Sequence, residues 1–436
     1  MTEKDLKMPD PDRAVLVGLV WGRETQESVE RSLDELEGLL KTAGGEAVAR
    51  LTQNKEAPDV RTVIGSGKVA ELANLCSLNE VELVVFDCEL SPSQIRNLEM
   101  ALGDTVRVID RSMLILDIFA LHAVTGEGKL QVELAQLKYT APRLSGHGSE
   151  MSRLGGGIGT RGPGESKLET DRRHMQRRIR ALEAQIDEMD KNRRTMRASR
   201  DRSGIAKVAI VGYTNAGKST LLNRLTDAGI LAEDKLFATL DPTTRKYVLP
   251  CGEPVLLTDT VGLINKLPHH LVSAFRSTLE EACSADILLI LTDASDPAFR
   301  DHLRVTEEVL GDLGAVGKPT LYVFNKCDRG MAELGRIGTD APMENVVYIS
   351  AATGQGIEGL IGRLEAMVTD GKRRVTYRIP NADAGALNTL YRVATVEEVD
   401  YGADAITAVA LADAKARGMM KRYAVDDLPD SKQDEE

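Results

Sequence analysis

The sequence contains few of the residues that build disulfide frameworks, metal clusters and aromatic stacking surfaces. Only five of its 436 residues are cysteines, and their positions do not follow the spacing of a metal or redox pair. We therefore expect reduced thiols of the kind found in cytosolic proteins. Aromatic residues make up 4% of the chain. So few aromatic side chains argue against a surface on which nucleic-acid bases stack.

Signals for export, membrane insertion and general nucleic-acid binding are also missing. The segment 1–12 is polar and acidic, unlike a signal peptide. No apolar run is long enough to span a bilayer, and no basic amphipathic helix carries aromatic anchors. The net charge is −12, so any affinity for nucleic acid must be local. We expect a monomeric, cytoplasmic protein of two to four domains, without stable membrane association.

The sequence does contain four nucleotide-binding motifs in a fixed order. The first follows an apolar run at 207–212, typical of a buried strand, and precedes a helical pattern at 220–225. In such a phosphate loop, backbone N–H groups and the helix N-terminus face the phosphates. We expect Lys218 to reach the β- and γ-phosphates and Ser219 to bind Mg²⁺. The predicted phosphate contacts are Gly212, Tyr213, Thr214, Asn215, Ala216, Gly217, Lys218, Ser219 and Thr220.

The second motif, at 259–262, ends another apolar run and is expected to respond to the γ-phosphate. Asp259 can hold Mg²⁺ directly or through water, and the N–H of Gly262 can donate to the γ-phosphate. With Lys218, these two residues are the predicted catalytic groups. The predicted nucleotide contacts of this motif are Asp259, Thr260, Val261 and Gly262.

A segment upstream of that motif fits a first switch. A threonine in it would complete the Mg²⁺ coordination, and Thr239, Thr243 and Thr244 are the candidates. The alternative is a threonine-rich turn before a strand. The predicted nucleotide contacts here are Phe237, Ala238, Thr239, Leu240 and Asp241.

The third and fourth motifs predict recognition of guanine. The Asp328 carboxylate can accept from the guanine N1–H and exocyclic amine, whereas adenine would leave this charge unpaired. Asn325 is expected to hold the loop, and the Lys326 side chain to pack on the base plane. The predicted base contacts are Asn325, Lys326, Cys327, Asp328, Ser350, Ala351 and Ala352. The four motifs together describe a site that binds and hydrolyses GTP.

Two positions bear on the rate of hydrolysis. Leu263 stands where Ras-like GTPases have a glutamine that positions water, so the isolated chain is expected to be slow until a partner assists it. Asn215 lies in a spacing that resembles GTPases holding a K⁺ ion between protein and phosphates. The alternative to K⁺ binding is that Asn215 only caps the loop.

The segment before these motifs alternates strand and helix patterns. Strands are predicted at 46–51, 82–87 and 105–109, and helices at 29–40 and from Ser91, with Pro92 in its first turn. This alternation predicts a small parallel sheet covered by helices. Residues 65–68 resemble part of a phosphate loop, but we favour a turn before a helix from Val69.

Two further helical patterns are predicted to form an antiparallel hairpin. Leu130, Leu134, Leu137 and Ala141 share one helix face, and Leu168, Met175, Ile179, Leu182, Ile186 and Met189 share another. A long Gly-rich loop with scattered cations joins them, which is typical of a functional or disordered segment. Its cations could lie along RNA phosphates. The predicted RNA contacts are Arg143, Arg153, Arg161 and Lys167.

Charge is locally positive after this loop. From 172 to 207 there are twelve Lys or Arg and five Asp or Glu. A solvated helix face with ion pairs would explain part of this surplus. The run at 191–202 favours RNA contact instead.

The C-terminal segment predicts a small α+β domain. A strand at 374–379 and a helix at 384–391 precede two strands, at 394–399 and 405–410, that pair as a hairpin. The sequence thus predicts a multidomain α/β protein. Its predicted parts are an N-terminal α/β domain (1–124), a helical hairpin (125–203), a P-loop GTPase domain (204–370), a small α+β domain (371–425) and an acidic disordered tail (426–436).

The chain resembles the HflX family of ribosome-associated GTPases. The residues that carry the resemblance are the motifs at 212–219, 237–243 and 259–262 and the Gly-rich loop at 155–169, and the loop is the most family-specific of them. The resemblance covers most of 14–370. Within the first switch, it favours Thr239 as the Mg²⁺ ligand.

The resemblance implies that the GTP form binds the large ribosomal subunit, with the hairpin tip near ribosomal RNA. It also implies that the ribosome stimulates hydrolysis and that the protein dissociates stalled or idle ribosomes under stress, with a fraction brought to membranes through ribosomes. The alternative is a GTPase that regulates RNA modification or another RNA–protein assembly. That function would need a cofactor site or nucleophile outside 205–370, and the sequence shows none.

Overall fold

The structure is a computed structural model that describes most of the chain. The described residues are 12–103, 105–143, 163–201, 205–226, 236–237, 242–266, 281–315, 317–330 and 343–425, and in 163–201 side chains are described at 170, 172–189 and 191. The chain divides into two compact units. The first comprises Met1–Lys191, Ala232–Asp241 and Val261–Leu279, and the second comprises Asn192–Leu231, Pro242–Thr260 and Glu280–Glu436. Among these described stretches, no helix is long and apolar enough to cross a membrane.

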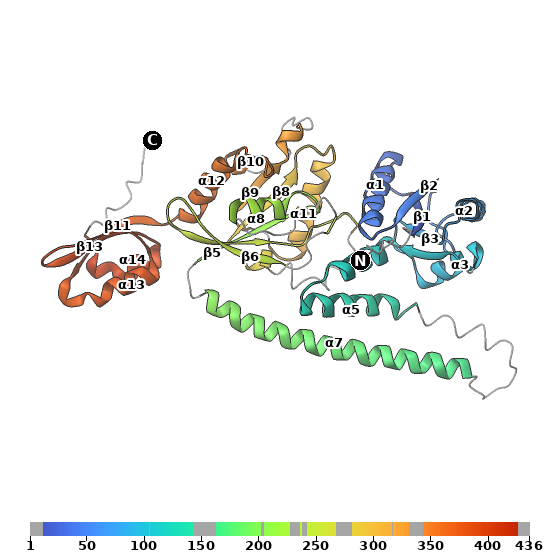
Figure 1. Ribbon diagram of the computed structural model, residues 1–436, viewed down its shortest axis with the longest axis horizontal. Coiled ribbons are helices and arrows are strands. Elements are labelled where there is room, and N and C mark those ends of the chain that lie inside the picture. The colour runs from blue at the N-terminus through green and yellow to red at the C-terminus, as the bar shows by residue number, and fades with distance from the viewer. Residues whose placement is uncertain are drawn as a thin grey trace, which may run out of the picture. The chain divides into compact units, whose positions relative to one another are not determined.

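A four-stranded parallel sheet forms the N-terminal part of the first unit (Figure 1). Its strands are β1 (Arg13–Val20), β2 (Glu46–Asn54), β3 (Leu83–Phe86) and β4 (Arg107–Asp110), in the order β2-β1-β3-β4. The helices that alternate with them are α1 (Gln26–Thr42), α2 (Ser66–Asn79), α3 (Pro92–Leu102) and α4 (Arg111–His122). The strand order reverses between β1 and β3, so a crevice is expected at the carboxyl ends of these strands.

The predicted elements of this sheet are present, with small shifts in their limits. α3 begins as predicted, because Ser91 caps it and Pro92 lies in its first turn. α2 begins at Ser66, before the predicted start at Val69, and Lys68 pairs with Glu71 on its surface. The sequence does not predict α4, because this helix is apolar on most sides and shows no amphipathic pattern.

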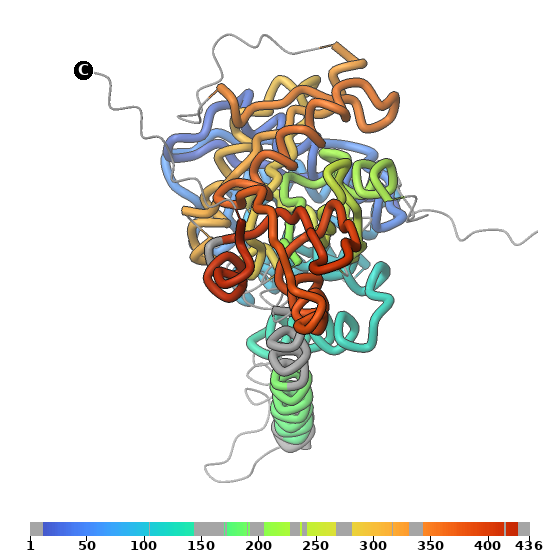
Figure 2. Tube along the Cα trace, turned by 90° about the vertical axis from the view of Figure 1, so that its left-hand side faces the viewer, coloured from blue at the N-terminus to red at the C-terminus, as the bar shows by residue number. Residues whose placement is uncertain are grey.

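The helical hairpin consists of α5 (Gly126–Thr140) and α7 (Pro163–Asp201), which run in opposite directions (Figure 1). Figure 2 shows the green middle part of α7 foreshortened, with its turns stacked along the line of sight. Two ion pairs join the helices, Glu133 with Arg178 and Lys138 with Glu183. On the predicted face of α7, Leu182 is fully buried.

α5 buries a further set of residues beside the predicted apolar face. Its buried residues include Gly128, Val132, Ala135 and Tyr139, whereas Leu130, Leu134 and Leu137 are only half-buried. α5 packs on α4, and since the sequence gives no pattern for α4, it could not indicate which side of α5 that helix covers.

The second unit contains a six-stranded sheet in the order β10-β9-β8-β5-β7-β6. Its strands are β5 (Ala206–Gly212), β6 (Thr243–Val248), β7 (Pro254–Asp259), β8 (Ile287–Asp293), β9 (Thr320–Asn325) and β10 (Val346–Tyr348). β6 pairs antiparallel with β7, and the other neighbours are parallel. The helices are α8 (Lys218–Thr226), α11 (Phe299–Asp312) and α12 (Ile357–Thr369), with 3₁₀ turns η3 (Cys327–Arg329) and η4 (Met343–Asn345). The carboxyl ends of the parallel strands carry the predicted motifs.

A three-stranded antiparallel sheet ends the second unit. Its strands are β11 (Arg373–Pro380), β12 (Thr395–Tyr401) and β13 (Ala405–Ala412), in the order β11-β13-β12. The helices are α13 (Gly385–Val393) and α14 (Ala414–Met420), with 3₁₀ turns η5 (Asn381–Asp383) and η6 (Lys421–Tyr423). The predicted hairpin is confirmed, as is the mixed α/β class with a P-loop domain. The predicted domain limits stay predictions.

Candidate functional site

The phosphate loop joins β5 to α8, as predicted. At Gly212, an added Cβ would lie 2.1 Å from the carbonyl oxygen of Leu291. At Gly217, which has a φ of +94°, a Cβ would lie 2.3 Å from Nδ2 of Asn325. Only glycine fits these two positions, because a side chain would displace either the β8 backbone or the asparagine that holds the loop.

Lys218 is buried at the start of α8, and its ammonium group faces backbone carbonyls. Nζ donates to the carbonyl oxygens of Gly212 at 3.1 Å and Tyr213 at 2.9 Å. Burial lowers the pKa of Lys218 to about 8, and the Asp259 carboxylate opposes this shift. A polyphosphate would place negative charge beside the ammonium and favour its protonated form.

Ser219 and Asp259 form the donor set predicted for Mg²⁺. Ser219 Oγ donates to Asp259 Oδ2 at 2.6 Å. Asp259 is fully buried, and in the described part of the chain its Oδ1 has no hydrogen-bond partner. Burial raises the pKa of Asp259, although Lys218 and Ser219 oppose the shift. A buried carboxylate oxygen with spare bonding capacity beside a hydroxyl suits a hard divalent cation, so these residues fit Mg²⁺.

Asn325 connects the phosphate loop to the base-recognition loop. Its Nδ2 donates to the carbonyl oxygen of Ala216 at 2.8 Å, and its Oδ1 accepts from the backbone N–H of Ala351 at 2.9 Å. Asn325 is 2% exposed, so both amide bonds are shielded from water. The structure therefore gives this residue the holding role expected from the sequence.

The other base-recognition residues lie beside Asn325. Asp328 is exposed and available to a ligand. Lys326 adopts a left-handed backbone with φ +62° and its Nζ pairs with Asp293 Oδ2 at 2.8 Å. Ser350 is fully buried and accepts from the N–H of Thr353 at 3.1 Å. The remaining predicted contacts, Cys327 and Ala352, lie on the same two loops.

Two residues of this region carry no motif signal in the sequence. Asp293 ends β8 and pairs with Lys326. In the sequence, an acidic residue at the end of an apolar run is the only signal that could have indicated it. His302, on α11, stacks on Tyr213 of the phosphate loop with ring centroids 3.8 Å apart. The surface position of an amphipathic helix gave no indication of this contact.

The first switch is described only at its start. Phe237 is 2% exposed with φ +57°, and its ring meets Phe119 edge to face at 4.7 Å. Thr244 lies in β6 and shares a hydrogen bond with Thr258 at 2.9 Å. Ala238, Thr239, Leu240 and Asp241 lie outside the described residues. Mg²⁺ binding by Thr239 therefore stays a prediction.

The second switch begins at the end of β7. The Thr260 hydroxyl donates to the carbonyl oxygen of Ile210 at 2.8 Å, which fixes the start of the segment. From Val261 onward the chain, including Gly262, groups with the first compact unit. Leu263 is 3% exposed and brings no polar group for positioning water.

Asn215 occupies a left-handed position of the phosphate loop. Its φ is +58° and its side chain is exposed. Asparagine tolerates this conformation better than most residues, so loop geometry alone explains the residue type. K⁺ binding by Asn215 stays a prediction.

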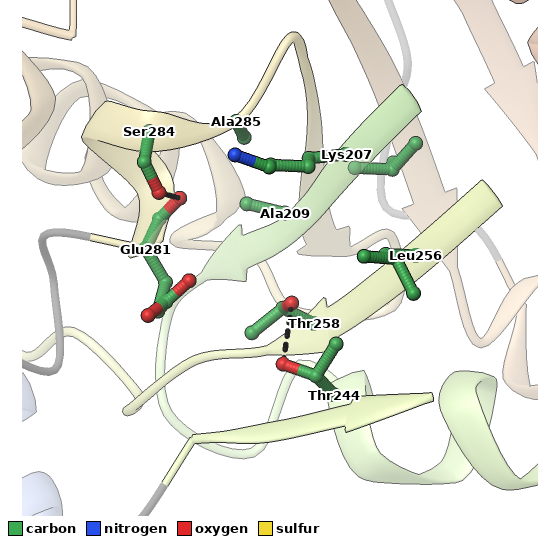
Figure 3. A pocket seen from close by; sticks show the side chains of 9 residues that line it. Lys207, Ala209, Thr244, Leu256, Thr258, Glu281, Ser284 and Ala285 are labelled. Carbon is green, nitrogen blue, oxygen red and sulfur yellow. Dashed lines mark hydrogen bonds between the residues drawn. The ribbon is translucent and has the colours of Figure 1, made fainter. Parts of the chain in front are cut away.

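A small cavity lies beside β5 and β7 (Figure 3). Lys207, Ala209, Thr258, Glu281 and Ser284 are among its lining residues, and its volume is about 20 Å³. That is enough for about one water molecule and far too small for a nucleotide. The nucleotide-binding groups lie at the carboxyl ends of these strands instead.

Among the predicted RNA contacts, only Arg143 is described. Its guanidinium lies 3.2 Å from the centre of the Tyr139 ring, donates to the carbonyl oxygens of Tyr139 and Leu90, and pairs with Asp110 at 3.5 Å. These contacts attach the end of α5 to the N-terminal sheet. Arg153 and Arg161, and the side chain of Lys167, lie outside the described residues, so RNA binding at all four stays a prediction.

Three family profiles match successive parts of the chain. Residues 30–120 match one described as GTP-binding GTPase N-terminal, 122–200 the GTP-binding GTPase middle region, and 207–326 a 50S ribosome-binding GTPase. A GTPase HflX of Lacrimispora saccharolytica is 50% identical over 395 residues, covering 91% of this chain and 92% of the relative. The chain belongs to the HflX family of GTPases.

One further HflX relative and one solved structure are also similar to the chain. The GTPase HflX of Escherichia coli is 42% identical over 389 residues, covering 89% of this chain and 90% of the relative. A solved GTP-binding protein of Sulfolobus solfataricus in complex with GDP is 25% identical, with a TM-score of 0.43, and the match covers 82% of this chain and 99% of that one. As a member of the HflX family with this site, the chain is an enzyme that hydrolyses GTP to GDP and phosphate.

Proposed function

We propose that this HflX-family GTPase binds the large ribosomal subunit in its GTP form, dissociates stalled or idle ribosomes under stress, and is released by hydrolysis. The observation that carries the ribosomal part is the match of 207–326 to the profile described as 50S ribosome-binding GTPase. The basic surface of α7 supports it, since Arg172, Arg177 and Arg180 are exposed on that helix. Exposed arginines are suited to RNA phosphates.

The reaction is an attack of water on the γ-phosphate. Lys218 holds the β- and γ-phosphates through its ammonium group, and the backbone between Gly212 and Gly217 surrounds them. Mg²⁺, held by Ser219 and Asp259, would neutralise charge on the phosphate oxygens. The Gly262 N–H donates to the γ-phosphate, so the second switch responds to its loss.

Water activation is the step that this chain supplies least well. Leu263 is apolar and buried, in the position where other GTPases carry a polar residue that orients water. We propose that the ribosome completes the site, with K⁺ at Asn215 as a further candidate contribution. We expect slow GTP turnover in the isolated protein. A further fall in the rate when Na⁺ replaces K⁺ would support a role for K⁺, whereas equal rates in the two salts would exclude it.

Sedimentation with purified large ribosomal subunits tests the ribosomal part of the proposal. The expected result is co-sedimentation with a non-hydrolysable GTP analogue but not with GDP, weakened by deletion of 143–167. A matched control replaces the same segment with a Gly/Ser linker of equal length, which keeps the hairpin connection but removes the cations. Absence of binding in both nucleotide states would contradict the proposal.

Regulation of RNA modification or of another RNA–protein assembly is the alternative. In the described residues there is no group of three or more His, Cys, Asp or Glu side chains arranged to hold a metal, so nothing observed favours that function. We propose a cytoplasmic location with a ribosome-bound fraction at membranes. Fractionation with and without ribosome depletion tests it.

A further inference from the structure

The first compact unit contains both nucleotide-sensing segments. Ala232–Asp241 and Val261–Leu279 group with Met1–Lys191 rather than with the sheet that carries the phosphate loop. In each of these segments, described residues make specific contacts within that unit. The N-terminal sheet is therefore in direct contact with the parts of the chain that respond to GTP.

The contact of the second switch is an ion pair between Lys266 and two carboxylates. Lys266 Nζ lies 2.7 Å from Asp87 Oδ2 and 2.9 Å from Glu24 Oε1. Asp87 is 3% exposed and follows β3 directly. It also accepts from Ser32 Oγ at 2.7 Å and from Arg111 Nη1 at 2.7 Å, so the lysine completes a buried polar network.

The contact of the first switch is apolar. The buried Phe237 ring packs edge to face on Phe119 of α4. Leu236, which precedes Phe237, lies against Gly38 of α1. A Cβ added at Gly38 would be 3.1 Å from the leucine Cδ1. Both switches are thus attached to helices and strand ends of the same sheet.

Lys266 also lines a cavity that contains the only tryptophan of the chain. The cavity has a volume of about 480 Å³ and lies at the carboxyl ends of β1 and β3, where Trp21, Glu24, Asp87, Arg111 and Lys266 contribute to its walls. Trp21 is 45% exposed. Trp21 and Lys266 thus line the same cavity, which makes the indole a suitable reporter of a movement there.

We propose that Lys266 couples the γ-phosphate to this cavity, and that the GTP and GDP forms differ in its contact with Asp87 and Glu24. Lys266 lies four positions after Gly262, a span of at most about 14 Å. A shift of Gly262 towards the γ-phosphate is therefore transmitted to the lysine. Such coupling needs two arrangements with different contacts. Asp87 binds Arg111 through Oδ1 and Lys266 through Oδ2, so it keeps a cationic partner when Lys266 moves away. This inference rests on the GTPase activity and is independent of ribosome binding.

Trp21 fluorescence of the full chain tests the coupling. Emission is compared at saturating GDP and saturating non-hydrolysable GTP analogue, with nucleotide binding measured separately by calorimetry. We expect the two nucleotides to give different emission in the original chain. We expect Lys266→Met to bind both nucleotides but to lose the difference, and Lys266→Arg to restore it.

Two further variants separate coupling from damage to the fold. Glu24→Gln removes one partner at the rim, leaves Asp87 paired, and should reduce the difference. Lys246→Met changes an exposed lysine of β6 and should leave it intact. The proposal is overturned if the original chain shows no difference, or if Lys266→Met keeps it. It is also overturned if Lys266→Met binds neither nucleotide while Lys266→Arg binds both, since the lysine would then belong to the nucleotide site.

Discussion

Each compact unit has a lysine near a buried aspartate at the end of a parallel strand, yet the two environments are opposite, since Lys218 is buried and Lys266 lies at the surface. Lys218 bonds to backbone carbonyls, and burial lowers its pKa to about 8. Burial alone would also lower the pKa of Lys266, but the carboxylates of Asp87 and Glu24 more than offset it and the pKa is raised. The first lysine is arranged to receive an anion, whereas the second is already neutralised within the protein.

This difference separates a ligand site from a structural contact that uses the same residue types. A lysine that exchanges carbonyl contacts for phosphates gains interaction energy when the nucleotide binds. A lysine between two carboxylates gains nothing from an added anion, and it is displaced only by a movement of its own backbone. The following changes would break or sharpen this comparison.

The largest expected effect is the loss of Lys218. We expect Lys218→Met to lower kcat for GTP hydrolysis about 1000-fold, because it removes the preorganised positive charge at the phosphates. Single-turnover GTP hydrolysis measures it. Lys68→Met is the matched control, because Lys68 also directly follows a glycine near the start of a helix but pairs with Glu71. A comparable loss in that control would contradict the assignment of the site.

Removal of the partner of Lys266 is expected to affect stability more than catalysis. Asp87→Ala leaves Lys266 and Arg111 with fewer compensating charges, which costs about 3 kcal/mol of unfolding free energy. Chemical denaturation followed by Trp21 fluorescence measures it. Asp34→Ala, which removes an exposed partner of Arg50, should cost less than about 1 kcal/mol. Equal losses in both variants would show that burial of the network contributes nothing.

Base selectivity is expected to depend on Asp328. Asp328→Asn should weaken GTP binding at least about 100-fold, because the amide presents a donor where guanine requires an acceptor. Calorimetric titration with GDP and with xanthosine diphosphate measures it. Xanthine carries a carbonyl in place of the exocyclic amine, so the variant should prefer it. Unchanged GDP affinity would exclude Asp328 from base recognition.

The smallest predicted effect is a pH dependence of nucleotide binding. Phosphates bind the protonated form of Lys218, whose pKa is lowered to about 8 in the protein without nucleotide. GDP affinity should therefore fall as pH rises through this value, by about fourfold between pH 7 and 8.5. Titrations at both pH values measure it. The GDP affinity that remains in Lys218→Met should be the same at both pH values. Affinity that rises with pH would contradict the assignment.

The sequence predicts those parts in which local pattern and chemistry coincide. The phosphate loop needs Gly212 and Gly217 at fixed spacing, and the structure places both where no side chain fits. Ser91 with Pro92 marks a helix start, and the alternation at 394–410 marks a hairpin. In each case the signal lies within a few residues.

Contacts between distant residues carry no such signal. Lys266 and Asp87 are 179 positions apart, and nothing in either neighbourhood indicates the pairing. The same reason explains why the most deeply buried residues of α5 were not predicted and why His302 was missed beside Tyr213. Long-range packing decides these features, whereas the sequence pattern reports only that a helix has a polar and an apolar side.

The amide of Asn325 has a consequence for ligand choice. One side chain bonds both to Ala216 on the phosphate loop and to Ala351 on the base loop, so the separation between the two recognition points is set by the length of a single amide group. The site is therefore expected to select ligands by the distance between their base and their phosphates. Free guanine or inorganic pyrophosphate reaches one end only, and a nucleotide with an altered spacer between base and phosphates satisfies one loop at the expense of the other.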